Sequence, residues 1–262
     1  MANKPPKSGE IASAFTNEAG CICQPMPLDR ILETRDEARE KLKNLLIDLR
    51  SRVGLHDFEI GPNKKLDRAI NKAKRDYEGD ITRVTDFVRA KGIVTTPEQV
   101  EEIKTALSEG DGKQFLDDHG IRIVRETDFF ESPKDLTGYR CLNYKIAIPI
   151  GPDTVTKPEY QVVELQIVAE QIEAVYSTTH PHKVTAEEIL NRDEELDRLG
   201  RREVAYNYAA CRYHNGIAAR DAGYDKLLLP EERKSHAMTK SRELKLTDQM
   251  DKLASMDEYG QT

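Results

Sequence analysis

Hydrophobic residues in the first part of the chain recur mainly at helical spacing, every three or four positions. Residues 28–53 contain a leucine stripe on one helical face, and Gly54 follows as the expected end of the helix. Residues 64–80 repeat the helical pattern with many more basic positions. A third helix is predicted from Thr96, because a threonine followed by Pro97 is typical of a helix start. The leucine stripe consists of Leu42, Leu45, Leu46 and Leu49.

The middle of the chain switches to alternating apolar and polar positions, which are typical of strands. Such runs occupy residues 84–95, 121–130, 139–150 and 160–169. The third helix is expected to end at Gly110 and Gly112, and residues 56–63 are expected to form a loop. Helical spacing returns after the last run and reappears after Pro230. This order predicts an α+β fold, with a mixed sheet of four to five strands flanked by helices.

Composition and periodicity divide the chain into a core and three flanking segments. Residues 1–26 are rich in Pro, Gly, Ser and Asn without any period, and are expected to form a disordered tail. Residues 27–58 are interpreted as an N-terminal helical extension, and residues 191–262 as a C-terminal one. The remaining residues, 59–190, contain the predicted strands and are expected to form the core domain.

The overall composition favours long solvated helices around a core. The 262 residues are 38% hydrophobic and 33% charged, with a mean hydropathy of -0.67. No stretch reaches the length of a membrane span, and the first residues lack the apolar run of a secretory signal. The four cysteines lack zinc-site spacing and indicate reduced thiols, so we expect a cytoplasmic protein without membrane contact. A net charge of -7 argues against a general nucleic-acid-coating surface, although 40 lysines and arginines can form a local basic pocket.

Two acids occupy positions where a strand made only for packing does not need them. Asp86 opens the first predicted strand, and Glu164 lies inside the apolar run VVELQIV. A carboxylate that is removed from water is costly unless a cation meets it. Alternation offers a plainer interpretation of Glu164, because it shares a strand face with Gln166 while Leu165 points the other way. On that interpretation the face is simply solvated.

Five basic residues flank Asp86 in the sequence. They are Lys64, Arg68, Lys72, Arg89 and Lys91. The first three repeat at helical spacing ahead of Asp86, and the last two follow it at strand spacing. A solvated helix face is the commoner explanation of such a charge run. Combined with the two acids, the pattern instead favours a polyphosphate site, in which cations bind phosphates and the acids hold the Mg²⁺ that bridges them.

The segment PKDLTGYRCLN, residues 133–143, combines a turn with the start of a predicted strand. Gly138 allows a close approach of another group to the backbone. An exposed Tyr139 at this point can stack on a nucleotide base, although tyrosine is also an ordinary strand former.

The order of these pieces resembles the synthetase domain of the RelA/SpoT family, the alarmone synthetases. The basic helix is followed by DFVRAK at 86–91, by PKDLTGYRCLN at 133–143 and by ELQI at 164–167. His180 or His182 then completes the family order. Each motif is short, so the resemblance depends on the order of the motifs along about half of the chain.

The resemblance implies a nucleotidyltransferase-like mixed sheet and the transfer of pyrophosphate from ATP to the 3′-hydroxyl of an acceptor nucleotide. Asp86 and Glu164 would be catalytic and would hold Mg²⁺, with Glu164 near the acceptor hydroxyl as a metal ligand or general base. The implied phosphate-binding residues are Lys64, Arg68, Lys72, Arg89 and Lys91. The implied acceptor-binding residues are Tyr139, Arg140, Asn143, Gln166 and His180. Alignment and charge neutralisation would provide most of the catalysis.

Four positions, in three of the motifs, depart from the family pattern. Asn143 stands where the family has the His of G-Y-R-S-L-H, Val168 and Ala169 replace the Arg-Thr that follows E-I-Q-I, and Lys91 stands in for an Arg. The first two departures concern acceptor recognition. The resemblance implies guanosine nucleotides as the default acceptor, and these departures leave adenosine nucleotides or the 3′ end of tRNA, as in toxin-type relatives, open.

The chain shows no pattern of an alarmone hydrolase domain, and is interpreted as a small stand-alone synthetase or a related toxin. Its flanking helices are candidates for a homo-oligomer contact or for an antitoxin-like protein partner. Two other functions remain to be weighed. A catalytically silent nucleotide-binding regulatory module would bind ATP without turnover. A helical interaction protein, with the sheet as scaffold, would have no affinity for ATP.

Overall fold

The computed structural model describes residues 15–16, 21–134, 137–151, 158–179, 209–224 and 229–241. The chain divides into two compact units. The first comprises Met1–Phe129 and Cys141–Glu170, and the second comprises Phe130–Arg140 and Gln171–Thr262. Within the described ranges, no helix is long and apolar enough to cross a membrane.

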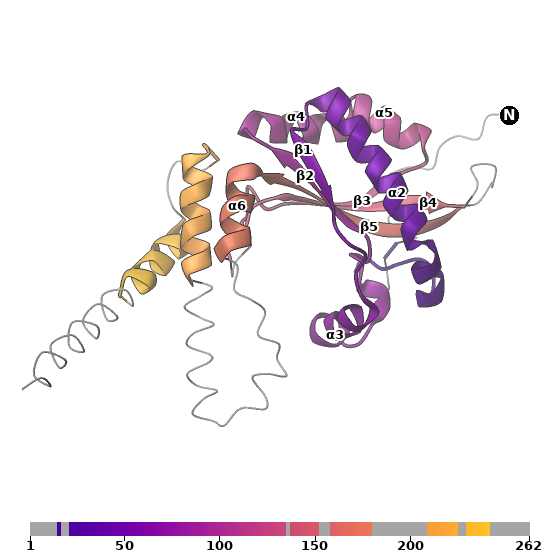
Figure 1. The fold of residues 1–262 in the computed structure, drawn as a ribbon, viewed down its shortest axis with the longest axis horizontal. Coiled ribbons are helices and arrows are strands. Elements are labelled where there is room, and N and C mark those ends of the chain that lie inside the picture. The colour runs from indigo at the N-terminus through magenta and orange to yellow at the C-terminus, as the bar shows by residue number, and fades with distance from the viewer. Residues whose placement is uncertain are drawn as a thin grey trace, which may run out of the picture. The chain divides into compact units, whose positions relative to one another are not determined.

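The first unit is built on a five-stranded mixed sheet with the strand order β1-β2-β5-β4-β3 (Figure 1). The strands are β1 (Asp57–Ile60), β2 (Arg89–Val94), β3 (Arg122–Asp128), β4 (Leu142–Ile150) and β5 (Glu159–Ala169). β2 and β5 run parallel, and the other neighbours run antiparallel. The helices are α2 (Leu28–Val53), α3 (Leu66–Asp76), α4 (Pro97–Ser108) and α5 (Asp111–Asp118), with a short 3-10 helix at Ile81–Arg83. The predicted α+β fold with a mixed sheet is confirmed.

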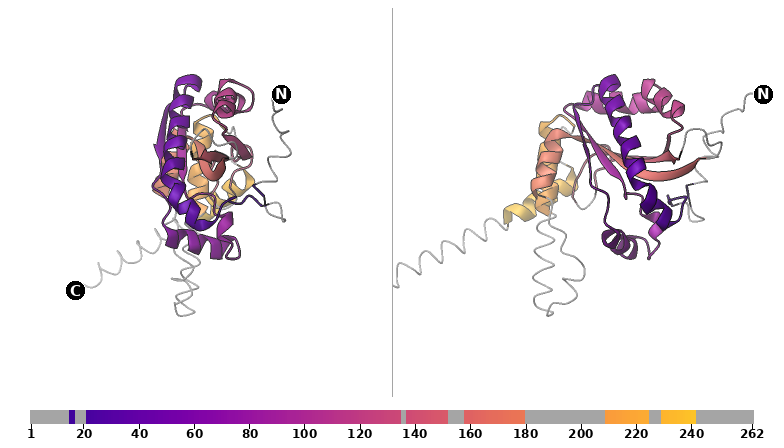
Figure 2. Two further views of the ribbon diagram at one scale, coloured as in Figure 1. Left: turned by 90° about the vertical axis from the view of Figure 1, so that its right-hand side faces the viewer. Right: turned by 45° about the vertical axis from the view of Figure 1, so that its right-hand side comes forward.

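The helix α2 crosses one face of the sheet, and α4 and α5 lie together near one of its ends (Figures 1 and 2). The predicted leucine stripe of α2, Leu42, Leu45, Leu46 and Leu49, is fully buried. Gly92 of β2 has no room for a side chain, because a Cβ at this position would lie 2.9 Å from the Ile167 side chain and 3.0 Å from the Leu55 side chain. The stripe therefore builds the core of the first unit, and its amphipathic character is no sign of an oligomer contact.

The opposite face of the sheet is polar along its central strands. In β5, Leu165 and Ile167 are fully buried, whereas the alternating positions carry polar side chains. Side chains directly opposite each other across a strand pair share a face, so the register identifies the residues that meet there. They are Arg89 and Lys91 of β2, Glu164 and Gln166 of β5, and Asn143 and Lys145 of β4. We call these six residues the polar face.

Three expected elements differ from the structure. Residues 56–63 were expected to form a loop but contain the edge strand β1, whose four residues are too few for alternation to show. Gly112 lies inside α5 instead of ending a helix. Its lack of a side chain lets α5 approach the end of α4, since a Cβ there would lie 2.9 Å from the Ala106 carbonyl oxygen. β2 begins only at Arg89, so Asp86 precedes the strand that it was expected to open.

Part of the expected disordered tail, residues 1–26, packs against the sheet. Phe15 is buried beside Val162 of β5. The Gln24 side chain accepts a hydrogen bond from the Val162 N–H at 2.8 Å and donates to the Val162 carbonyl at 2.8 Å and the Val84 carbonyl at 3.3 Å. One buried amide thus bridges β5 and the chain ahead of Asp86, a role that composition cannot reveal.

The second unit contains the segment 130–140, most of α6 (Glu170–Thr179), and helices at residues 209–221 and 230–241. Helical structure was predicted for all three helices and is confirmed there. His180, His182 and the expected domain boundary after residue 190 lie outside the described residues.

We expect Gln24→Ala to lower the free energy of unfolding by about 2–4 kcal/mol, because one buried N–H and two buried carbonyls lose their partner. Urea denaturation measures this loss. Gln114→Ala is the matched control, since Gln114 is exposed on α5 and donates to Asp118 at the surface. Equal effects of the two substitutions would contradict the structural role of Gln24.

Candidate functional site

Asp86 lies in the segment that leads into β2, and its carboxylate is buried between two lysines. Lys64 Nζ donates a hydrogen bond to Asp86 Oδ2 at 2.6 Å, and Lys72 Nζ lies 3.0 Å from the same oxygen. The Lys64 backbone N–H also donates to the Phe87 carbonyl at 2.9 Å. The start of α3 is therefore tied directly to the segment that carries Asp86.

The two lysines keep Asp86 ionised. Burial alone would raise the pKa of Asp86, but Lys72 and Lys64 outweigh it and lower that pKa to about 2. The pKa of Lys64 is lowered, because its own burial outweighs the attraction of Asp86. The pKa of Lys72 is raised, since Asp86 and Tyr77 together outweigh the cost of burying its ammonium.

The second oxygen of Asp86 suits a metal ligand. Among the described residues, Asp86 Oδ1 is buried and has no hydrogen-bond partner. The same ranges contain no cluster of three or more His, Cys, Asp or Glu side chains that would form a complete metal cage. Mg²⁺ commonly binds one or two carboxylates and takes its other ligands from water and substrate phosphates. Asp86 Oδ1 can therefore serve as one carboxylate ligand of a Mg²⁺ ion of this kind.

Glu164 of β5 has both carboxylate oxygens engaged by neighbours on the polar face. Lys145 of β4, directly opposite in the register, donates to Glu164 Oε2. Gln166 Nε2 donates to Glu164 Oε1 at 2.9 Å. Burial would raise the pKa of Glu164, but Lys145 more than offsets it and lowers that pKa. Glu164 is therefore ionised and hydrogen-bonded at neutral pH.

The backbone brings the two acids into one neighbourhood. The Glu164 N–H donates to the Val88 carbonyl at 3.0 Å, which joins the segment after Asp86 to the centre of β5. The charges of Asp86 and Lys72 both act on the pKa of Glu164. Two carboxylates and their lysines thus form one electrostatic cluster at the junction of α3, β2 and β5.

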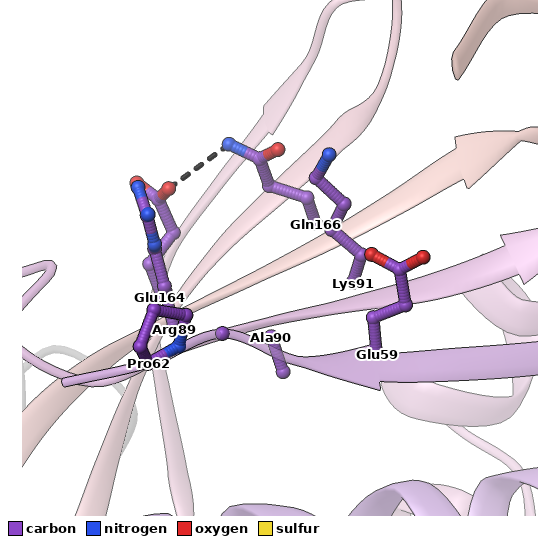
Figure 3. A pocket seen from close by; sticks show the side chains of 8 residues that line it. Glu59, Pro62, Arg89, Ala90, Lys91, Glu164 and Gln166 are labelled. Atoms are coloured by element: carbon purple, nitrogen blue, oxygen red, sulfur yellow. Dashed lines mark hydrogen bonds between the residues drawn. The ribbon is translucent and has the colours of Figure 1, made fainter. Parts of the chain in front are cut away.

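A pocket of about 260 Å³ opens on the polar face beside this cluster. It is lined by Glu59, Gly61, Pro62, Arg89, Ala90, Lys91, Glu164 and Gln166. Figure 3 shows Arg89 beside Glu164 at one side of the pocket, and Lys91 beside Gln166 and Glu59 at the other. The backbone at Gly61 lies close to the Arg89 side chain: a Cβ at this glycine would lie 3.0 Å from Arg89 Cγ. The pocket therefore offers two cationic side chains next to one acid of the pair.

The remaining residues that the sequence singled out lie in different surroundings. Arg68 is exposed on α3, on the helix that also supplies Lys72. Asn143 is buried on β4, directly opposite Gln166 in the register. These four residues belong to the first unit, whereas Tyr139 and Arg140 belong to the second.

Tyr139 is not exposed as the sequence predicted, and Arg140 beside it is also buried. Tyr139 is 2% exposed, its hydroxyl donates to Glu173 at 2.7 Å, and its ring lies 4.0 Å from that of Tyr176. Arg140 is fully buried and donates to Glu232 Oε1 at 2.7 Å. Side chains of later helices meet both residues, and sequence motifs hold no information about such contacts.

Lys145 is the residue of the site that the sequence analysis did not name. The alternation of the run at 139–150 places Lys145 on the same face as Asn143, so the signal was present. It was overlooked because a lysine in an alternating strand is usually a solvated residue. Only the register between β4 and β5 sets it against Glu164.

Comparison with known proteins supports the fold. The small alarmone synthetase 2 from Bacillus subtilis is 18% identical and superimposes with a TM-score of 0.50, over 76% of this chain and 97% of that chain. The small alarmone synthetase 1 from Bacillus subtilis bound to its product pppGpp gives 16% identity and a TM-score of 0.48, over 74% and 95%. A GTP pyrophosphokinase family protein from Streptococcus pneumoniae gives 15% and 0.44, over 76% and 96%.

No protein-family model and no curated protein matches the chain. The likeness to the small alarmone synthetase 2 shows that the chain has this fold, as the resemblance in its sequence implied.

We expect Asp86→Asn to remove part of the acid sensitivity of the fold. Folding lowers the pKa of Asp86 from its ordinary value of 3.8 to about 2, so the ionised carboxylate stabilises the folded chain. That contribution is complete above about pH 5 and is lost as the pH falls through about 2. The parent chain should lose about 2 kcal/mol more unfolding free energy than Asp86→Asn across this range, as measured by urea denaturation.

The control for this comparison is Asp67→Asn, an exposed acid on α3, which should keep the acid dependence of the parent. An unchanged acid dependence in Asp86→Asn would show that the two lysines do not hold this carboxylate.

We expect Lys145→Met to move the pKa of Glu164 from below its ordinary value to above it, because burial then acts without its main counter-charge. Carboxyl NMR of selectively labelled glutamate measures the titration. Lys113→Met, which breaks an exposed pair with Asp117 on α5, should leave Glu164 unchanged. A Glu164 titration that is identical in Lys145→Met and the parent would rule out the proposed control by Lys145.

Proposed function

We propose that the chain is an ATP-dependent pyrophosphokinase that transfers the β,γ-pyrophosphate of ATP to the 3′-hydroxyl of an acceptor nucleotide. The observation that carries this proposal is the cluster of two ionised acids, the buried Asp86 and the partly buried Glu164, each held by lysine beside a cationic pocket. The fold supports it, since the small alarmone synthetase 2 from Bacillus subtilis shares that fold. A sheet that is only a scaffold gives no reason for burying two carboxylates and their counter-charges.

The cations and acids take complementary parts in the proposed reaction. Lys64 and Lys72, with Arg68, Arg89 and Lys91, would neutralise the phosphates of ATP. Asp86 would hold Mg²⁺, which would supply further charge neutralisation at the phosphates when it is bound. The chain's own contribution is then alignment of the two substrates in a fixed field of charge.

In the proposed transfer, one bond forms at the β-phosphorus of ATP and one bond to it breaks. The acceptor 3′-oxygen bonds to the β-phosphorus of ATP, and the bond from that phosphorus to the oxygen shared with the α-phosphorus breaks. AMP leaves with that oxygen. The hydroxyl proton passes to Glu164, which acts as the general base.

Lys145 and Gln166 engage the Glu164 carboxylate that is proposed to accept the proton. A carboxylate with both oxygens engaged and a lowered pKa is a weak base. The phosphates of an acceptor nucleotide are the natural competitor for the Lys145 ammonium, because they are anions that arrive at the same face. We infer that acceptor binding transfers Lys145 from Glu164 to phosphate, which raises the pKa of Glu164 when the base is needed.

The proposed acceptor is a guanosine nucleotide, GDP or GTP, with adenosine nucleotides or the 3′ end of tRNA as the alternative. Asn143 and Gln166 lie opposite each other on the polar face, and their amides can donate to and accept from a base or ribose. Tyr139 can stack on a base only if Tyr176 leaves its ring. His180 stays a proposed acceptor residue from the sequence alone.

We expect Mg²⁺ and ATP labelled at the γ-phosphorus to yield a labelled 3′-modified nucleotide when GDP, GTP, AMP, ADP, ATP and bulk tRNA are offered in parallel. Asp86→Asn and Glu164→Gln should each lower the rate by roughly 10²–10³-fold, because each removes a charge on which the transition state depends. Asp67→Asn and Glu170→Gln, both exposed acids, are the matched controls and should keep most of the activity.

The acceptor that becomes labelled identifies the substrate. ATP binding without any turnover, in folded protein and with every acceptor, would favour the silent regulatory module. No affinity for ATP would contradict both of these functions.

A further inference from the structure

The short connection between α3 and Asp86 folds back on itself and places Arg83 against Tyr77. Tyr77 follows the last residue of α3, and its carbonyl accepts a hydrogen bond from the Asp80 N–H at 2.9 Å. Asp80 Oδ1 accepts from the Thr82 N–H at 3.0 Å and from the Thr82 hydroxyl at 2.6 Å, which caps the 3-10 helix that contains Arg83. The central carbon of the Arg83 guanidinium lies 4.8 Å from the centre of the Tyr77 ring.

Lys72 lies on the same aromatic ring. Its ammonium nitrogen is 5.8 Å from the centre of the Tyr77 ring and 3.0 Å from Asp86 Oδ2. An arginine stacked on a tyrosine recurs in protein structures and indicates no ligand by itself. Here, however, one ring joins Arg83 to a lysine that already belongs to the candidate site. The positive charge of the site therefore extends from α3 into the 3-10 helix.

The Arg83 guanidinium has no acidic partner within the described ranges. It is half-buried, and neither an ion pair nor a side-chain hydrogen bond satisfies its five N–H donors there. Asp80, the acid closest in sequence, has its Oδ1 engaged within its own turn. Lys64 and Lys72 already share the carboxylate of Asp86. Arg83 therefore adds a positive charge that no described carboxylate neutralises by contact, and an anionic ligand would neutralise it.

We propose that Arg83 binds a phosphate group of the donor nucleotide, and that Tyr77 is a positioning residue that holds Arg83 in place for it. A guanidinium offers paired N–H donors that match two phosphate oxygens, and stacking on an aromatic ring fixes their plane. The donor is favoured over the acceptor because Lys72, on the same ring, contacts Asp86, the proposed metal ligand. This inference rests on the proposed function for the identity of the nucleotide, whereas binding can be measured without turnover.

The test measures the binding of Mg²⁺–ATP and of Mg²⁺–tripolyphosphate to the full chain by titration calorimetry, without any acceptor. Tripolyphosphate offers the phosphates alone, so it separates their recognition from that of the base. The test variant is Arg83→Gln. Arg122→Gln is the matched control, because Arg122 is also a half-buried arginine of the first unit but pairs with Asp117 at 3.3 Å. The KM values for ATP and for the acceptor are measured on the same proteins.

We expect Arg83→Gln to weaken the binding of both ligands by about tenfold or more, because each loses charge-assisted hydrogen bonds. The ATP KM should rise in parallel, with the acceptor KM within about twofold of the parent. Arg122→Gln should bind both ligands as the parent does. If Arg83→Gln does not fold, Arg83→Lys, which keeps the charge but loses the planar fork, should still weaken both by about threefold or more.

The positioning role of the Tyr77 ring is tested by two substitutions. Tyr77→Phe keeps the ring and should hold both affinities within about twofold of the parent. Tyr77→Leu removes the ring and should weaken both ligands by about threefold or more, because Arg83 then loses the surface on which it stacks. Parent affinities in Tyr77→Leu would show that the ring does not position Arg83.

Three further results would overturn the proposal. Affinities of Arg83→Gln equal to those of Arg122→Gln would show that Arg83 only packs on Tyr77. A raised acceptor KM with unchanged affinities for ATP and tripolyphosphate would assign Arg83 to the acceptor. A parent that binds neither ligand would refute this proposal and the proposed function together. A parent that binds ATP but transfers nothing would refute the proposed function alone, and the affinity comparison would still decide the role of Arg83.

Discussion

The contact of Lys64 and Lys72 with the buried carboxylate of Asp86 is the interaction on which the arrangement of the site depends. A carboxylate at this depth is tolerated only because two ammonium groups, at 2.6 and 3.0 Å, outweigh the cost of its burial. The same contact ties α3 to the segment that enters β2. Since β2 then pairs in parallel with β5, the position of the basic helix relative to Glu164 follows from it.

The folded chain already contains charged groups that could bind the phosphates and the metal of the proposed substrates. Lysines that stabilise the two acids are the groups proposed to bind phosphate, and the oxygen of Asp86 that lacks a described partner is the one proposed to bind Mg²⁺. Binding a metal-nucleotide complex would therefore exchange partners within a preformed field instead of creating one. Lys145 takes part in the same proposed exchange, because its release from Glu164 would link acceptor binding to the basicity of this carboxylate.

Much of the fold was predictable because periodicity reports burial directly. The leucine stripe of α2 and the alternation around Glu164 both followed from sequence, whereas β1 was too short to show a period and Gly112 looked like a helix end. Both acids were identifiable from the sequence because a strand made only for packing does not need them. The cations near Asp86 were identifiable from their spacing around it. The pairings of Lys145 with Glu164 and of Arg140 with Glu232 join residues distant in sequence, and only the tertiary structure reveals such partners.

The most direct test of the central claim is a crystal structure of the full chain with Mn²⁺ in place of Mg²⁺ and a non-hydrolysable ATP analogue. The account predicts an anomalous Mn²⁺ signal at the Asp86 carboxylate, with the analogue's phosphates in contact with Lys64, Lys72 and Arg89. A nucleotide bound away from the polar face, with Asp86 and Glu164 still held by their lysines, would contradict it.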